Sequence, residues 1–206
     1  METQQASEHL QVIRTLMERS ALYRRALAPI MVFCGAVGIV AGLVGSWLTF
    51  KTDGGFILFW SGTAVLALTG AFLLVRKQAF KDSEPLWSSP TRRVAQALLP
   101  PLLIGAFINL VGGFKLRGND PEVQILFITV WSWLYGCALH SAGFFMVRGI
   151  RLFSWIFLIS GCALFIPTLT DRIPALPCWM MGVLFGVSHL AYGVYLYFTE
   201  NRKPAL

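Results

Sequence analysis

The chain has 206 residues, of which 56% are hydrophobic and only 13% carry a charge. The charged share is about half of that in an ordinary soluble domain, which excludes that class and favours a membrane protein. A formal net charge of +7 could suggest nucleic-acid binding. The basic residues lie in short clusters between apolar runs, and no nucleic-acid-binding motif is present, so we expect no nucleic acid partner.

Six runs free of Asp, Glu, Lys and Arg predict an all-α fold with six transmembrane helices in one bundle. Each run reaches the length of about 20 residues that crosses a hydrocarbon core. A polar N-terminal segment, residues 1–25, precedes the transmembrane domain at residues 26–199, and a short tail, residues 200–206, follows it. The predicted spans are residues 29–50, 56–75, 94–114, 123–147, 152–169 and 178–199.

The basic residues also predict an orientation in the membrane. Of the 17 Lys and Arg residues, 13 lie in the N-terminal segment, the second and fourth connections and the tail, and 4 lie in the other connections. Because cytoplasmic loops are enriched in Lys and Arg, we expect both termini in the cytoplasm. The protein would then be a multi-pass membrane protein with its N- and C-termini on the same, cytoplasmic side.

Two cytoplasmic segments are candidates for contact with lipid or with a protein partner. In residues 1–25, four apolar side chains share one face of a predicted helix, which could lie on the membrane surface or dock on another protein. The second segment, residues 76–93, is polar except for Leu86 and Trp87, which could enter the membrane interface or contact a partner. The four residues of the N-terminal face are Leu10, Ile13, Leu16 and Met17.

Glycines in the first and last spans repeat at helical spacing. The first span holds a small-xxx-small pattern, and in the last span three glycines and His189 follow a 4-3-4 spacing on one helix face. Smooth faces of this kind let helices approach closely, so we expect packing within the chain. The glycines concerned are Gly38, Gly42, Gly182, Gly186 and Gly193.

Three short connections have recognisable turn chemistry. Asp53-Gly54-Gly55 predicts a tight turn outside the membrane after the first span. Asn119 or Asp120 is expected to cap the fourth span, with Pro121 at its first position. The charged sequence RGIR at Arg148–Arg151 predicts the turn between the fourth and fifth spans.

Polar side chains inside the spans are candidate site residues, because such groups in a membrane are costly and often functional. His140 and His189 lie at similar depths, so they could together ligate a haem b iron or relay protons. The alternative is that each bonds to a Ser, a Tyr or a carbonyl on a neighbouring helix. Asn109 is expected to bond across helices. The full candidate set is Asn109, Tyr135, His140, His189 and Tyr192, with Ser141 and Ser188 as further possible partners.

Other chemistry finds little support in the sequence. The four cysteines lie in apolar runs without CxxC spacing, so we expect no disulfide framework and no metal site. No span contains a carboxylate, and no hydrolase, metalloprotease or nucleotide-binding motif occurs. We therefore expect no enzyme activity and no cofactor apart from the possible haem.

Several strings resemble a family of small bacterial six-span membrane proteins of unknown function. They are LFGVSHLAYG in the last span, with Phe185, Gly186, His189 and Gly193, together with IRTLMERS at Ile13–Ser20, SSPTRRVAQALLPPL at Ser88–Leu102 and WLYGCALHSAG at Trp133–Gly143. The resemblance implies a bacterial inner-membrane protein and supplies no activity. The leading hypothesis is a non-enzymatic membrane component that acts through protein partners or lipid. The alternatives are a small transporter for a small or hydrophobic substrate, with a site near Asn109, His140 and His189, and a b-type haem protein with His140 and His189 as ligands.

Overall fold

The structure, a computed structural model, describes residues 27–81, 87, 89–170 and 176–200, and within these residues every regular element is a helix. Six stretches are long and apolar enough to cross a membrane, which confirms the prediction of an all-α chain with six candidate spans. The elements are a first helix at Leu27–Trp47, α2 at Asp53–Lys81, α3 at Ser89–Lys115, α4 at Pro121–Ala142, α5 at Arg148–Leu169, and a last span built from α6 at Pro177–Met181, the π-helix η1 at Gly182–Val187 and α7 at Ser188–Glu200.

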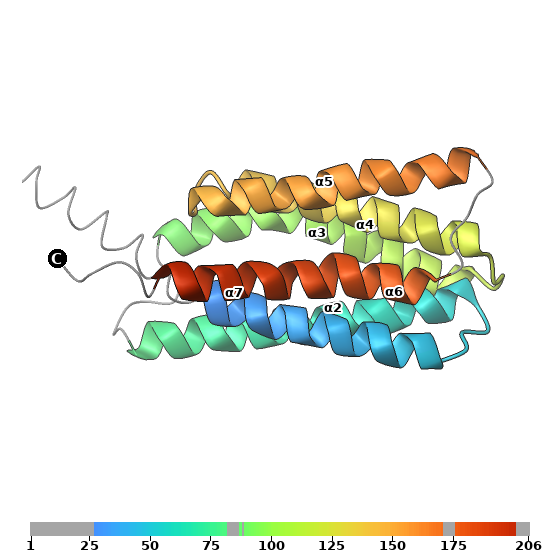
Figure 1. Ribbon diagram of the computed structural model, residues 1–206, viewed down its shortest axis with the longest axis horizontal. Coiled ribbons are helices and arrows are strands. Elements are labelled where there is room, and N and C mark those ends of the chain that lie inside the picture. The colour runs from blue at the N-terminus through green and yellow to red at the C-terminus, as the bar shows by residue number, and fades with distance from the viewer. Residues whose placement is uncertain (1–26, 82–86, 88, 171–175, 201–206) are drawn as a thin grey trace, which may run out of the picture.

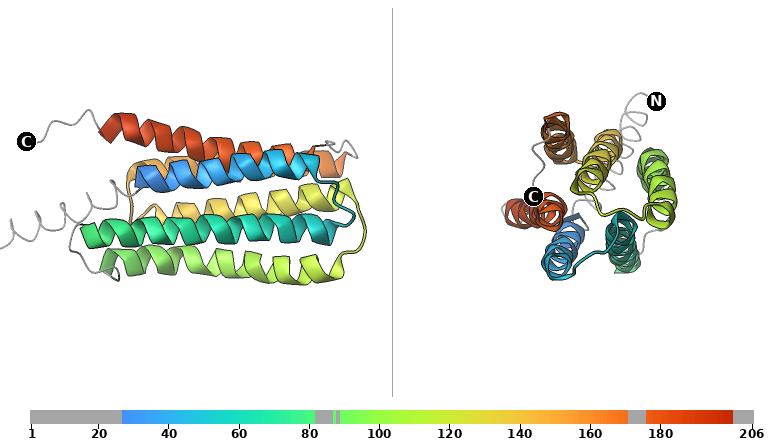
Figure 2. Two further views of the ribbon diagram at one scale, coloured as in Figure 1. Left: turned by 90° about the horizontal axis from the view of Figure 1, so that it is seen from below. Right: turned by 90° about the vertical axis from the view of Figure 1, so that its right-hand side faces the viewer.

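The helices lie side by side along one long axis, and successive spans run in opposite directions (Figure 1). The start of the first helix and the end of α7 therefore lie at the same end of the bundle. Viewed along the axis, the helices follow one another around a ring in chain order, and the last span returns beside the first helix (Figure 2). This closure places the two glycine-rich spans next to each other.

The helices differ greatly in how much of their surface the bundle covers. Half of the apolar window of α4 is buried, at 50%, against 11% for α2. α2 and α3 instead expose large apolar side chains such as Leu66 and Phe107. Exposed apolar faces of this extent are expected where helices contact lipid. α4 is thus central, and α2 and α3 are peripheral.

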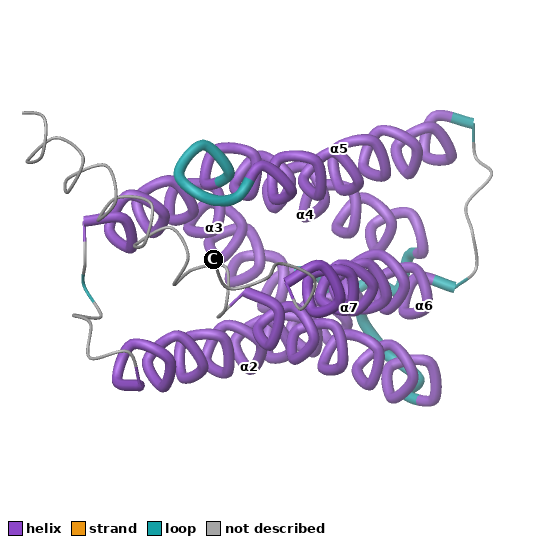
Figure 3. Tube along the Cα trace, turned by 60° about the vertical axis from the view of Figure 1, so that its left-hand side comes forward, coloured by secondary structure: helices purple, strands orange, loops and turns teal. Residues whose placement is uncertain are grey.

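The predicted boundary between the fourth and fifth spans was wrong. α4 ends at Ala142, and the turn is Gly143–Val147, shown in teal before α5 in Figure 3, so RGIR forms the first turn of α5. The Gly143 N–H donates to the Leu139 carbonyl at 2.8 Å, which closes α4. The turn itself contains no charged residue. A span end placed at the first charged residue therefore falls after the turn.

The helix that holds the second predicted span extends beyond that span. α2 continues to Lys81, six residues beyond the predicted end at Val75, so the connection 76–93 begins as helix. The guanidinium of Arg76 lies over the ring of Phe80 one turn later, 5.4 Å from its centroid. Cationic side chains of this kind can extend a membrane helix into the interface, because their apolar stems stay in contact with lipid.

The two proposed contact segments are only partly described. Residues 1–25 and Leu86 lie outside the described residues. Trp87 is described and is 66% exposed. Whether either segment contacts a partner or the membrane surface stays a prediction.

The predicted turn at Asp53-Gly54-Gly55 was wrong, because these residues form the first turn of α2. The side chain of Asp53 is only 2% exposed. Its carboxylate accepts hydrogen bonds from the Asp120 N–H at 3.1 Å and from the Gln124 side-chain amide at 3.0 Å. Asp120 is the N-cap of α4, as predicted, with Pro121 at the first helical position. We call Asp53, Asp120 and Gln124 the Asp53 clasp, since they fasten the start of α2 to the start of α4.

Candidate functional site

The first helix and the last span touch through their backbones. A Cβ added to Gly38 would lie 2.7 Å from the Cα of Gly186, and one added to Gly42 would lie 2.8 Å from the Cα of Gly182. Gly193 packs in the same way against Val32. We call Gly38, Gly42, Gly182, Gly186 and Gly193 the glycine seam. It lies inside the chain, between two antiparallel helices.

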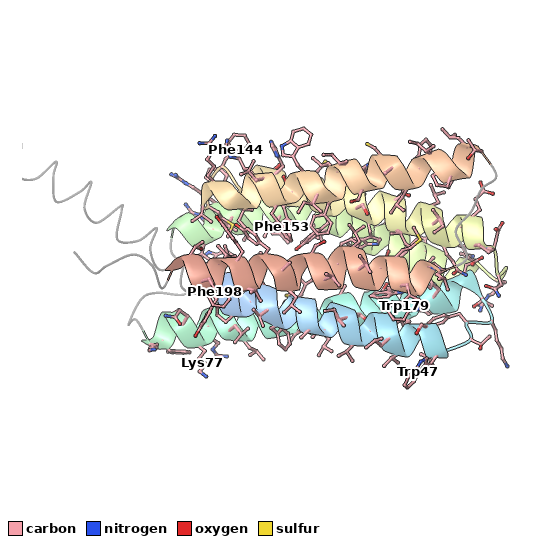
Figure 4. The ribbon with its side chains drawn as sticks, viewed as in Figure 1. Trp47, Lys77, Phe144, Phe153, Trp179 and Phe198 are labelled. Carbon is pink, nitrogen blue, oxygen red and sulfur yellow. The ribbon has the colours of Figure 1, made fainter. Side chains whose placement is uncertain are left out.

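His189 lies beside the glycine seam and not in it. The residue opposite Gly35 of the first helix is Leu190. A π-turn immediately precedes the histidine: the Ser188 N–H bonds to the Val183 carbonyl five residues back. Such a turn holds more residues than an α-turn, so the simple 4-3-4 spacing no longer places His189 with the glycines. Its ring instead packs against Phe153 of α5, which points into the bundle in Figure 4.

Both ring nitrogens of His189 have partners. Nδ1 lies 2.5 Å from the Phe185 carbonyl oxygen, and Nε2 lies 2.6 Å from the Tyr135 hydroxyl. Because a carbonyl oxygen only accepts hydrogen bonds, the geometry assigns the ring proton of a neutral His189 to Nδ1. Nε2 then accepts the hydrogen bond that the Tyr135 O–H donates. His189 is 4% exposed, so this pair forms a buried polar link between α7 and α4.

Asn109 links α3 to both neighbouring helices, which confirms the prediction that it bonds across helices. The Trp131 indole N–H donates to Asn109 Oδ1 at 2.8 Å, and Asn109 Nδ2 donates to the Ser61 hydroxyl oxygen at 2.8 Å. An indole N–H can only donate, so it fixes which end of the amide is the oxygen. Gly105, one turn before Asn109, leaves room for the indole, since a Cβ there would lie 2.8 Å from it.

A cavity of about 400 Å³ lies between the first helix, α2, α3, α4 and the last span. Asn109, Tyr135 and His189 all line it, together with mostly apolar side chains. Two other lining residues, Val65 and Leu110, are 62% and 60% exposed, so the cavity reaches the exposed apolar side of α2 and α3. Its volume falls in the range of small-molecule binding sites, about 300 to 1,000 Å³.

The structure does not bring His140 to this cavity. Its Nδ1 lies 3.2 Å from the Ser154 hydroxyl of α5, and its ring meets the edges of Phe144 and Trp155. Ser154 donates its own hydrogen to the Arg151 carbonyl and so accepts from the histidine. This is the hydrogen-bonded arrangement expected of a structural histidine, although with a serine that the sequence analysis did not propose.

The paired haem-ligand hypothesis does not fit these contacts. His140 and His189 share no partner, and each packs against different rings. The two nitrogens of His189 are already bonded within the chain, which leaves none free for iron. Among the described residues, no group of three His, Cys, Asp or Glu side chains is arranged to hold a metal ion.

Tyr192 also lies away from the cavity. Its ring stacks on Phe153, with centroids 4.6 Å apart and planes 12° apart. The hydroxyl is buried against Gly149 and has no hydrogen-bond partner in the described part of the chain. Of the five polar candidates, the structure therefore gathers Asn109, Tyr135 and His189 and leaves two elsewhere.

The sequence analysis missed Ser61 and Trp131, the partners of Asn109. The distance of each residue from the end of its span could have indicated the Ser61–Asn109 pair. Ser61 lies eight residues after the start of α2 and Asn109 lies six residues before the end of α3, so both are about 10 Å from the same end of the bundle. Matching polar residues by depth on adjacent spans would have paired them.

No protein family, curated protein or solved structure matches this chain. The resemblance to small bacterial six-span proteins therefore stays a prediction from the quoted strings.

Proposed function

We propose that this protein is a multi-pass membrane protein that binds an apolar molecule drawn from the bilayer. The observation that supports this function is the cavity of about 400 Å³ within the six candidate spans. Its wall is largely apolar, and it reaches the lipid-facing side at Val65 and Leu110. A molecule dissolved in the membrane could enter between α2 and α3 without crossing water.

The polar residues of the cavity favour binding over catalysis. Asn109, Tyr135 and His189 are each bonded to a neighbouring helix, and no carboxylate lines the wall among the described residues. A non-enzymatic component that acts through lipid agrees with this arrangement. Binding is also the first step required of a carrier, which is the alternative function.

We further propose that the membrane is the inner membrane. The end of the bundle where α2 ends and α3 begins would face the cytoplasm. Basic side chains gather at that end, where Figure 4 labels Lys77, whereas Trp47 and Trp179 mark the opposite end. The positive-inside rule supports this orientation. The described basic residues there are Arg76, Lys77, Lys81, Arg92, Arg93, Arg148 and Arg151.

Filling the cavity tests the proposed function. Ala64 of α2 lines the cavity, and Ala64→Phe would occupy part of it. Ala163 of α5 is exposed and does not line the cavity, so Ala163→Phe is a matched control. In native mass spectrometry from mild detergent, we expect the wild type and Ala163→Phe to carry one bound lipid-derived molecule and Ala64→Phe to lose it. Equal occupancy of all three chains, or a bare wild-type chain, would contradict the proposal.

A further inference from the structure

The chemistry of the cavity wall indicates what kind of molecule it takes, provided that the proposed binding function holds. We infer that the ligand is a long-chain lipid with an uncharged oxygen head, a hydroxyl or a carbonyl. The apolar chain would lie along the wall toward the bilayer, and the head would lie at Asn109 and Tyr135. Three observations lead to this class.

The first observation is the absence of charge from the wall. Among the described residues that line the cavity, none is Asp, Glu, Lys or Arg. An ionised head group would lose its hydration without gaining a partner of opposite charge, which is strongly unfavourable. A fatty acid anion or a phospholipid head is therefore a poor occupant, and an uncharged head is favoured.

The second observation is an unused donor on Asn109. The side chain is only 7% exposed, its oxygen accepts from Trp131, and its nitrogen donates one hydrogen to Ser61. An amide nitrogen carries two hydrogens, and the second has no partner in the described part of the chain. A buried donor without a partner destabilises the empty cavity. An oxygen atom of a bound molecule would relieve that cost.

The third observation is an unused acceptor on Tyr135. Its hydroxyl hydrogen is donated to His189 Nε2, because the Phe185 carbonyl fixes the proton of the imidazole on Nδ1. The lone pairs of the phenolic oxygen have no other partner among the described residues. Tyr135 follows Trp131 by one turn, about 6 Å along α4. The oxygen of a hydroxyl head group could therefore accept from the Asn109 amide. The hydrogen of the same hydroxyl could be donated to the phenolic oxygen of Tyr135 nearby.

The apolar part of the ligand has a route to the bilayer. Val65, Leu68 and Leu110 line the cavity and are also exposed on the lipid-facing side of α2 and α3. No polar group is needed along this route, since a hydrocarbon chain would replace other hydrocarbon chains there. The wall thus combines buried hydrogen-bonding groups at Asn109 and Tyr135 with an apolar exit.

Competition among three probes of equal chain length tests the inference. A radiolabelled long-chain alcohol is bound to the detergent-solubilised full-length chain and displaced by the unlabelled alcohol, by the alkane or by the fatty acid at a pH where it is ionised. We expect the alcohol to compete several-fold better than the alkane and about tenfold or more better than the carboxylate. The inference is wrong if the alkane equals the alcohol or if the carboxylate competes best.

Asn109→Leu adds a readout that a purely structural role would not change. We expect the alcohol to lose its advantage over the alkane while alkane binding stays the same, so the alkane serves as an internal control for folding. An unchanged advantage would overturn the role of Asn109 in binding the head. Should the variant not fold, the three-probe comparison on the wild type still decides the ligand class. Failure of every probe to bind would remove the proposed function as well, whereas binding with the wrong preference would remove only this inference.

Discussion

The two sides of the bundle are held together by different interactions. Along the glycine seam, the first helix and the last span meet backbone to backbone, with Gly38 against Gly186 and Gly42 against Gly182. On the other side, α2 and α3 expose many apolar side chains, and the bonds of Asn109 join α3 to α2 and α4 in addition to close contacts such as Gly54 against Gly113. The cavity lies between these two sides.

The difference follows from the proposed placement of the six spans in a bilayer. In a bilayer, lipid tails are as apolar as leucine, so helices gain no hydrophobic free energy by meeting one another. Association must come from close van der Waals packing or from polar bonds. Small residues provide the first at the glycine seam, and Asn109 and the Asp53 clasp provide the second around α2 and α3. The side where many apolar side chains face outward is also where the cavity opens.

The largest expected effect is a bulky substitution in the glycine seam. A Cβ on Gly186 would lie 2.5 Å from the Ile39 backbone nitrogen, and a backbone atom cannot rotate away as a side chain can. We expect Gly186→Leu to lower the free energy of unfolding by about 3 kcal/mol or more, measured by loss of helicity in a denaturing-detergent titration.

The matched control for the glycine seam is Gly62 on α2. A Cβ there would meet nothing within 4 Å, and the residue is exposed. Gly62→Leu should leave the titration midpoint nearly unchanged, since it adds an apolar side chain facing lipid. Equal sensitivity at both positions would mean that the glycine seam does not hold the bundle.

The glycine seam could be predicted from the sequence, because the helical spacing of small residues is a local pattern that the folded helices retain. The position of His189 was not, since the π-turn at Gly182–Val187 shifts every residue after it relative to a regular helix. The turn at Gly143–Val147 was also not predicted. Its residues carry no charge, so they continue the uncharged run from which the fourth span was defined.

The cavity could not be predicted from composition or spacing. It depends on how far α2 and α3 stand from the first helix, and that distance is set by side chains from several helices. The burial of Asp53 was missed because an Asp-Gly-Gly sequence is typical of an exposed turn. Only the partners on α4, Asp120 and Gln124, make a buried carboxylate tolerable there.

An intermediate effect is expected at the Asp53 clasp. Asp53→Ala would leave the Asp120 N–H without its acceptor and the Gln124 amide with Asn119 Oδ1 as its remaining one, and we expect a loss of about 2 kcal/mol in unfolding free energy. Asp53→Asn keeps one acceptor oxygen and should lose less than the alanine variant. The same titration measures both, and an alanine variant as stable as the wild type would show that the clasp does not fasten α2 to α4.

The smallest expected effect separates bonds between helices from bonds within one helix. Ser61 and Thr63 each donate to a carbonyl four residues back on α2, but only Ser61 also accepts from Asn109 of α3. We expect Ser61→Ala to cost about 0.6 kcal/mol, the average for a bond between membrane helices, and Thr63→Val to cost less. If the two variants are equally stable in the titration, the Ser61–Asn109 bond contributes nothing to holding α2 against α3. The alcohol probe should still bind to Ser61→Ala, although α2 is held less firmly in this variant. The reason is that the substitution frees a further hydrogen on the Asn109 amide.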